Sequence, residues 1–269
     1  MMSKRKGNKN FMNLNAAECL AASKLLHDNA DSLYNSAISL ANNSAWGHAT
    51  SLLIHSTEES MKAFILFLDG NGFQFRKSVD GISNLFVNHK LRYGLAMLLS
   101  ILHIFSEDLK QLVPKIANLT KLTFDFDKDK EQLGDVFLKY IQTRIKTVIL
   151  EVSWFSKAEF LRQDGFYVDY IDELKTPLQI KETDFKAVLL RIDGLRCFLH
   201  DYIKSFDTND VRILDGIENL KGQFISENWY EKIGKVIELF KDKKKNPLSD
   251  LSIILGDFSK SLDDTKSLT

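Results

Sequence analysis

The sequence predicts an all-α protein, a helical bundle with additional helices toward its carboxyl-terminal end. The 269-residue chain contains only 3 Pro and 13 Gly, and these are the residues that most often interrupt helices. Apolar residues recur every three or four positions along most of the chain, which is the period of an amphipathic helix. A chain of this length can also bury a sizeable core. We therefore expect five to seven helices.

The first half is expected to form three long helices after a disordered basic tail at residues 1–12. Asn15 is the predicted N-cap of the first helix, with Glu18 at the spacing of a capping box. A loop is expected at residues 73–84, and Pro114 is expected to lie beyond the third helix. The helices are predicted at residues 13–43, 45–69 and 84–110. The first of these ranges is either one long helix or a pair of helices.

The second half begins with a charged connector at residues 119–131 and a long amphipathic helix at residues 132–165. The segment 166–177 breaks the helical period and is expected to be extended, with one short strand. A basic hinge at 241–247 should be a solvated surface. Further helices are predicted at residues 182–204, 211–242 and 248–262.

Charge and cysteine content narrow the class of protein. Lys and Arg number 36, as do Asp and Glu, so attraction to nucleic acid or to anionic lipid must come from a local site. Cys19 and Cys197 lie in apolar helical contexts and are expected to be buried, reduced thiols. No apolar signal segment and no long uncharged apolar window is present. We expect a cytoplasmic protein without a membrane partner.

The stretch "LLIHSTEESMKAFILF" places charges in the middle of an apolar helix. One helical stripe comprises Ala49, Leu52, Ser56, Glu59, Ala63 and Leu66. Ser56 and Glu59 therefore interrupt an apolar seam, and a carboxylate there needs a partner. Lys62 follows Glu58 by four residues and Glu59 by three, while His55 precedes Glu59 by four, so all these pairs can touch.

Three interpretations of this stretch remain open. Glu59 and Lys62 can form a structural ion pair, or Glu59 can orient a base in a polar site of the bundle. A metal shared by His55 and Glu59 is the third, and it is disfavoured because the repeated Glu-x-x-His motif of di-iron bundles is absent. The start of the third helix supports a site, because its basic residues oppose the helix dipole and so indicate an anionic partner. These residues are His89, Lys90 and Arg92.

Three motifs resemble the AbiV family of bacterial abortive-infection proteins, within the HEPN group of helical domains. The first is Ser-x-Glu-Glu-x-x-Lys-Ala at residues 56–63, after a helix of small residues. The second is the pair His89-Lys90, and the third is Gly-Phe-Tyr-Val-Asp at residues 165–169, followed by Pro177. The resemblance covers about residues 13–190, which we assign to an AbiV/HEPN-like domain. Residues 191–269 are expected to be a helical extension packed on the same bundle.

The resemblance implies a HEPN-like fold, a homodimer and a role in anti-phage defence. Proteins of this family are associated with arrest of translation after activation by a phage-encoded protein, so RNA or the translation machinery is an expected partner. Many HEPN proteins are metal-independent ribonucleases that use an Arg followed, after four to six residues, by a His. This chain departs from that pattern, because Arg92 and His103 are too far apart and Arg196 and His200 are too close. No cofactor or metal is expected.

If the site cleaves RNA, we expect His89 to act in acid–base chemistry and Glu59 to orient it, with Lys62 as a third catalytic group. Lys90 and Arg92 are expected to bind phosphate. The predicted supporting residues are Ser56, Glu58, Tyr167 and Asp169. The segment holding Tyr167 and Asp169 either plugs the bundle or closes over the polar site. Two rivals stay open: a non-enzymatic binding module and a purely structural bundle in which the same charges stabilise the fold or the dimer.

Overall fold

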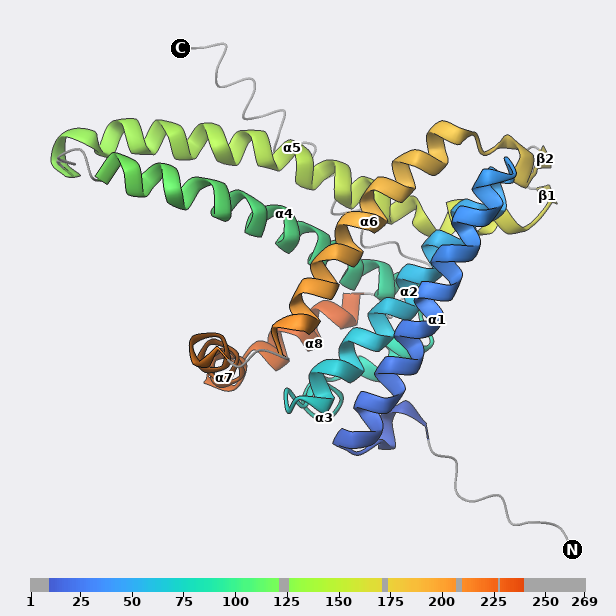
Figure 1. Ribbon diagram of the computed structural model, residues 1–269, viewed down its shortest axis with the longest axis horizontal. Helices are drawn as coiled ribbons and strands as arrows, with labels where there is room; N and C mark the ends of the chain where they lie inside the picture. Colours follow the sequence, from blue (N-terminus) through green and yellow to red (C-terminus); the bar gives the residue numbers. More distant parts are fainter. Residues whose placement is uncertain (1–9, 121–125, 171–173, 207–209, 227, 240–269) are drawn as a thin grey trace, which may run out of the picture. The chain divides into compact units, whose positions relative to one another are not determined.

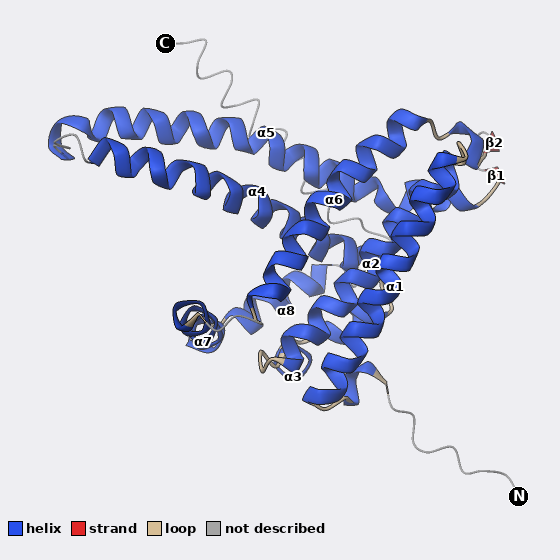
Figure 2. Ribbon diagram, viewed as in Figure 1, coloured by secondary structure: helices blue, strands red, loops and turns tan. Residues whose placement is uncertain are grey.

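The computed structural model describes residues 10–120, 126–170, 174–206, 210–226 and 228–239 (Figure 1). These residues form eight α-helices and two very short strands, which confirms the predicted all-α class (Figure 2). The helices are α1 (Ala16–Asn42), α2 (Trp46–Gly70), α3 (Phe75–Ser78), α4 (His89–Thr120), α5 (Phe126–Phe166), α6 (Glu182–Ser205), α7 (Val211–Ser226) and α8 (Trp229–Leu239). The other elements are β1 (Asp169–Tyr170), β2 (Leu174–Lys175), η1 (Phe11–Asn13), η2 (Ile82–Phe86) and η3 (Pro177–Gln179).

The described residues divide into two compact units. The first unit takes its residues from 1–96 and 158–245, and the second takes its described residues from 97–157. The first turns of α4 and the last turns of α5 therefore belong to the first unit, together with α1, α2, α6, α7 and α8.

The first unit is built on the pairing of α1 with α2, and α6 also packs on α2 (Figure 1). The predicted capping box starts α1: the Asn15 side chain accepts from Glu18 N at 2.9 Å, and the Glu18 carboxylate accepts from Asn15 N at 3.0 Å. Ala30 and Ala37 are fully buried along α1. Such small side chains let two helix backbones approach closely, and the Ser23 hydroxyl bridges them by donating to the α2 backbone at 2.8 Å.

Helix α2 is buried along most of its 25 residues. Its first turn is packed so tightly that a Cβ on Gly47 would lie 2.3 Å from the Pro177 carbonyl oxygen. A Cβ on Gly165, near the end of α5, would lie 2.1 Å from Ser51 Oγ on α2. Only glycine fits these two crossings. Helix α2 is therefore the centre of the first unit and brings its polar residues into the interior.

In the second unit α4 and α5 lie side by side where they are joined by a buried hydrogen bond. Ser100 Oγ on α4 donates to Glu151 Oε2 on α5 at 3.0 Å, and both side chains are buried. Val152 and Phe155 on α5 are buried at the same level. Helix α4 continues past Pro114 to Thr120, so the prediction that the helix ends before the proline is wrong.

Several predicted connections are helical in the structure. The expected loop at 73–84 contains α3 and the start of η2, and its buried Arg76 holds it in place through contacts with Asp69 and with the Leu14 carbonyl oxygen. The expected tail at 1–12 overlaps η1, whose Phe11 stacks on Phe86 at 4.9 Å between ring centroids. Local contacts that periodicity does not reveal explain both differences.

Other boundaries also shift. The expected helix at 211–242 is two helices, α7 and α8, and Asn228 between them has a left-handed φ of 55°. The expected connector at 119–131 is already helical from Phe126. The extended segment after α5 holds two strands, β1 and β2, that pair antiparallel. The predicted hinge at 241–247 and helix at 248–262 lie outside the described residues.

The two cysteines differ in exposure. Cys19 is buried, and burial raises the pKa of its thiol against the opposing charge of Arg76. Cys197 is exposed, which corrects the prediction that both are buried. Over the residues that the structure describes, none of the helices has both the length and the apolar character needed to cross a bilayer.

Candidate functional site

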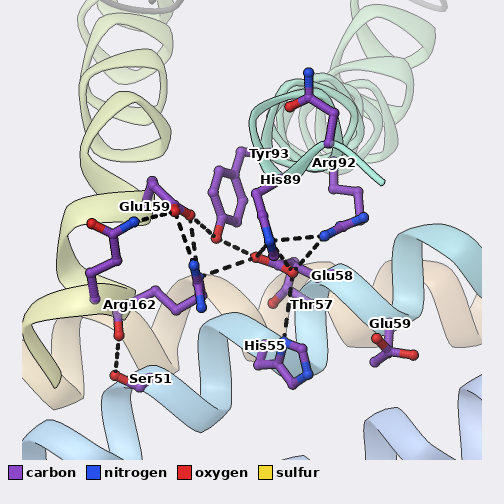
Figure 3. Close-up of polar contacts among 12 residues, drawn as sticks. Ser51, His55, Thr57, Glu58, Glu59, His89, Arg92, Tyr93, Glu159 and Arg162 are labelled. Atoms are coloured by element: carbon purple, nitrogen blue, oxygen red, sulfur yellow. Dashed lines mark hydrogen bonds and ion pairs between the residues drawn. The ribbon is translucent and has the colours of Figure 1, made fainter. Parts of the chain in front are cut away.

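A buried carboxylate, Glu58 on α2, lies at the centre of a polar cluster in the first unit (Figure 3). Its side chain is 0% exposed. From α4, His89 Nδ1 lies 2.7 Å from Glu58 Oε2, Arg92 donates to the same oxygen at 3.0 Å, and the Tyr93 hydroxyl donates to Oε1. The three partners share one turn of α4, so one helix end supplies three donors to a single carboxylate.

The last turns of α5 add a second charge pair. Arg162 binds Glu159 through two nitrogens, at 2.9 and 3.2 Å, and its Nε lies 3.6 Å from Glu58 Oε1. The Tyr93 hydroxyl oxygen lies 3.1 Å from Glu159 Oε2 and so links the two carboxylates. Ser51 on α2 donates to the Arg162 carbonyl oxygen at 2.7 Å. The cluster thus joins α2, α4 and α5 within one unit.

The donors around Glu58 keep it ionised. Burial by itself raises the pKa of a carboxyl, but hydrogen bonds from His55, His89 and Tyr93 and the charge of Arg92 outweigh burial, so the pKa of Glu58 lies well below its ordinary value. Burial and the nearby Glu58 carboxylate both raise the pKa of Tyr93. Glu58 is therefore an anion and Tyr93 a neutral donor at physiological pH.

Two groups face Nδ1 of the His89 ring. The ionised Glu58 carboxylate lies 2.7 Å from Nδ1, and the Arg92 guanidinium lies 2.8 Å from it. The carboxylate favours the tautomer with a proton on Nδ1, and the acid–base role of His89 requires that tautomer. The second nitrogen, Nε2, is left to exchange a proton with a ligand. The His89 side chain is 40% exposed, so a ligand can reach it. A carboxylate that orients an accessible imidazole in this way is a common acid–base device.

Three of these residues also have the spacing of metal ligands. One ligand atom each from Glu58, His89 and Glu159 lies within 4.8 Å of the others. The guanidinium groups of Arg92 and Arg162 already contact these carboxylates, and two positive charges at this distance oppose a third cation. The donor set therefore suits proton transfer better than metal binding.

Comparison with known proteins identifies the family of this chain. The family model HEPN_AbiV, described as AbiV, matches residues 18–196, which is more than half of the chain. This chain belongs to the HEPN_AbiV family. Comparisons with curated proteins and with solved structures gave no match. The matched range contains the whole Glu58 cluster, whereas α7 and α8 lie beyond it. Membership of the HEPN_AbiV family indicates a protein of abortive infection, a form of defence.

The structure corrects the predicted orienting carboxylate by one residue. His89 contacts Glu58, whereas Glu59 is paired with Lys62 of its own helix at 2.5 Å. Successive residues of a helix point about 100° apart, and α2 is buried around most of its circumference. An apolar stripe therefore could not show which of the two carboxylates faces α4. His55 likewise contacts Glu58, at 3.6 Å.

Two further predicted site residues have internal roles in this HEPN_AbiV chain. The Arg92 side chain is 5% exposed and donates to Glu58 and to the Leu85 carbonyl oxygen, so it holds the carboxylate instead of facing phosphate. Ser56 is buried and donates to the Leu53 carbonyl oxygen, within α2. Lys90 is half-buried on the first turn of α4, next to His89.

The segment after α5 does not meet either expectation for it. Tyr167 is 61% exposed, so it does not plug the bundle. Asp169 is exposed and its carboxylate accepts from the Tyr170 backbone N–H at 2.8 Å, so it does not close over the cluster. Asp169 belongs to β1, which pairs with β2 and is exposed, and the sequence pattern did not show this pairing.

Sequence reasoning missed three members of the cluster. Tyr93 had a usable signal, since it follows His89 by one helical turn at a site-bearing helix start. Glu159 and Arg162 gave no such signal, because an acid and an arginine three residues apart are typical of any exposed helix face. The crossing of α5 over α2 turns this ordinary pair toward Glu58.

Proposed function

We propose that this HEPN_AbiV protein arrests translation in phage-infected bacteria by cutting RNA without a metal ion. The observation that carries the proposal is the accessible His89 imidazole, held at Nδ1 by a buried, ionised carboxylate. Metal-independent cleavage of RNA needs such a group, because the attacking 2′-hydroxyl must lose a proton.

In the proposed reaction, His89 Nε2 takes the proton of the 2′-hydroxyl, the 2′-oxygen forms a bond to phosphorus, and the bond from phosphorus to the 5′-oxygen breaks. The products are a 2′,3′-cyclic phosphate and, once the leaving oxygen gains a proton, a 5′-hydroxyl. Glu58 stabilises the imidazolium that forms, and Arg92 and Tyr93 keep Glu58 in place.

Charge balance favours a phosphodiester as the ligand. Within the cluster, the carboxylates of Glu58 and Glu159 are balanced by the guanidiniums of Arg92 and Arg162. Each protonated imidazole therefore makes the site positive by one charge. Lys90, beside His89 at the start of α4, is our candidate for contact with the phosphate backbone. Glu59 and Lys62 neutralise each other, and we assign them to the packing of α2.

Controlled expression in bacteria tests the proposal. Wild type, His89→Ala and the control His200→Ala, an exposed histidine on α6, are compared for growth, incorporation of labelled methionine and integrity of total RNA. Wild type and the control should stop growth and fragment RNA, and folded His89→Ala should do neither. If wild type is harmless without phage, the same strains are challenged with a phage panel, and protection that survives His89→Ala contradicts the proposal.

Binding without cleavage is the second candidate function. It is favoured by the missing Arg–His interval and by the many internal contacts of the cluster, which suit a structural role. Growth arrest with intact RNA, retained in His89→Ala, would support it over cleavage.

In this proposal the protein acts in the cytoplasm as a homodimer, and a phage-encoded protein activates it. Leu98 and Leu102, one turn apart on α4, are each about half exposed and are a candidate contact for the second copy. Light scattering of wild type and of Leu98→Ser tests this assembly: a wild-type dimer that becomes a monomer supports it, and a wild-type monomer contradicts it.

A further inference from the structure

We propose that His55 is a second acid–base group of this site, paired with His89 through the shared Glu58 carboxylate. The inference rests on the proposed RNA cleavage and names the residue that supplies the leaving-group proton. The ribonuclease pattern has a single histidine, and the site predicted from the sequence gave His55 no acid–base role.

The first step of the argument is geometry. His55 Nδ1 lies 3.6 Å from Glu58 Oε2, and His89 Nδ1 lies 2.7 Å from the same oxygen atom. The two Nδ1 atoms can be no farther apart than these two distances combined. Figure 3 shows the carboxylate between the two rings, with His55 on α2 and His89 on α4.

The second step is access. The side chains of His55 and His89 are 37% and 40% exposed, while that of Glu58 is 0% exposed. The other two α4 partners of the carboxylate, Arg92 and Tyr93, are buried. The two imidazoles are therefore accessible to solvent, whereas the groups that hold them are buried. A ligand that reaches one ring is close to the other.

The third step is chemistry. Transesterification of RNA needs a base for the 2′-hydroxyl and an acid for the 5′-oxygen. With both Nδ1 atoms toward Glu58, each ring has Nε2 left for the substrate. His89 is the base of the proposed reaction and takes the 2′-proton. In the role that we assign to it, His55 gives its Nε2 proton to the leaving oxygen.

We expect the two imidazoles to determine how the rate of cleavage depends on pH, because the charged groups around them do not titrate near neutral pH. These surrounding groups are Glu58 on α2, Arg92 and Tyr93 on α4, and Glu159 and Arg162 on α5. The pKa of Glu58 is lowered and that of Tyr93 is raised. Burial opposes the charge of Arg162, but its hydrogen bond to Glu159 outweighs burial and raises its pKa. These shifts move the pKa values of Glu58, Tyr93 and Arg162 away from neutral pH. The rate should therefore fall on both sides of an optimum, as a base and an acid acting together require.

A leaving-group experiment tests the role of His55. The bond cut in bacterial RNA is mapped first, and one oligonucleotide with that bond is made in two forms, with an ordinary 5′-oxygen and with a bridging 5′-sulfur. Sulfur leaves as a thiolate and needs no proton. The full chain is compared as wild type, His55→Ala, His55→Gln, His89→Ala and the control His48→Ala, an exposed histidine on the same helix.

We expect His55→Ala and His55→Gln to lower cleavage of the oxygen substrate by about 100-fold or more and to lose the alkaline limb of the pH profile. On the sulfur substrate both variants should stay within about tenfold of wild type. His89→Ala should be defective on both substrates and His48→Ala on neither. If both His55 variants lose cleavage of the oxygen substrate and keep cleavage of the sulfur substrate, a purely structural role for His55 does not explain the result.

The contradicting results separate the two proposals. Wild-type rates in folded His55→Ala on the oxygen substrate overturn the role of His55 and leave the proposed function standing. Equal losses on both substrates also overturn it, because a residue that only holds Glu58 acts regardless of the leaving group. Absence of cleavage by wild type, with intact RNA in arrested cells, overturns the proposed function and this inference together.

Discussion

Replacement of Glu58 by glutamine should destabilise the first unit strongly. Glutamine keeps the size of the side chain but removes the charge and replaces one acceptor oxygen by an NH₂ group. Every contact that Glu58 makes with His89, Arg92 and Tyr93 comes from a donor, so the new NH₂ group faces donors. The Arg92 guanidinium, with its side chain 5% exposed, is left as a buried charge without its carboxylate.

The magnitude follows from that buried charge. Breaking a buried ion pair by removing one partner costs about 3–5 kcal/mol of unfolding free energy. Glu59→Gln is the matched control, because it makes the same change at the next residue of the same helix. Its partner Lys62 is 15% exposed and can turn its ammonium group toward water, so we expect a loss of about 1–3 kcal/mol, the range for an unsatisfied polar group.

Urea denaturation of the full chain, followed by far-UV circular dichroism, measures both losses. The reasoning is refuted if Glu58→Gln loses no more stability than Glu59→Gln. Acid provides a second check: because the pKa of Glu58 is lowered when the chain folds, its contribution is complete above the ordinary carboxyl value of 4.5 and disappears as pH falls below it. The gap between wild type and Glu58→Gln should therefore narrow on acidification, and a constant gap would contradict ionised Glu58.

Four other substitutions test the packing of the first unit. Tyr93→Phe removes the hydroxyl that donates to Glu58 and should lower the unfolding free energy by about 1.5–3 kcal/mol in urea; no change would place that hydroxyl in water. Gly47→Ala puts a Cβ 2.3 Å from a carbonyl oxygen of η3 and should cost about 3 kcal/mol. Gly216→Ala on α7 meets nothing within 4 Å and should stabilise by about 0.5–1 kcal/mol. If the two glycine variants shift the melting temperature in the same direction, the packing described at Gly47 is contradicted. Arg76→Ala leaves a buried aspartate unpaired and should cost about 3–5 kcal/mol, and an unchanged melting temperature would show that the pair contributes nothing.

The elements that sequence predicted well are those specified by local physics. The capping box of Asn15 and Glu18 is visible in four residues and is present in the structure. The long helices follow from an apolar period and from the scarcity of breakers. Pro114 is the exception, since α4 continues through it, and a local rule could not foresee that.

The sequence predicted which helices carry the candidate site but not which of their residues contact each other. The sequence placed a carboxylate of α2 opposite His89 of α4, and the structure confirms that pairing of helices, but with Glu58 in place of Glu59. Which of two adjacent carboxylates faces a neighbour depends on the rotation of a helix that is buried on most sides. Glu159 and Arg162 depend on where a distant helix crosses, which no local pattern encodes.

The most direct test of RNA cleavage at His89 is an analysis of RNA ends. Purified wild type, His89→Ala and His200→Ala are incubated with bacterial RNA in the presence of a chelator of divalent metals. We predict fragments with 2′,3′-cyclic phosphate and 5′-hydroxyl ends from wild type and His200→Ala, and intact RNA from folded His89→Ala. Fragments with 5′-phosphate ends that disappear with the chelator, or cleavage that persists in His89→Ala, would contradict an imidazole-based site at Glu58.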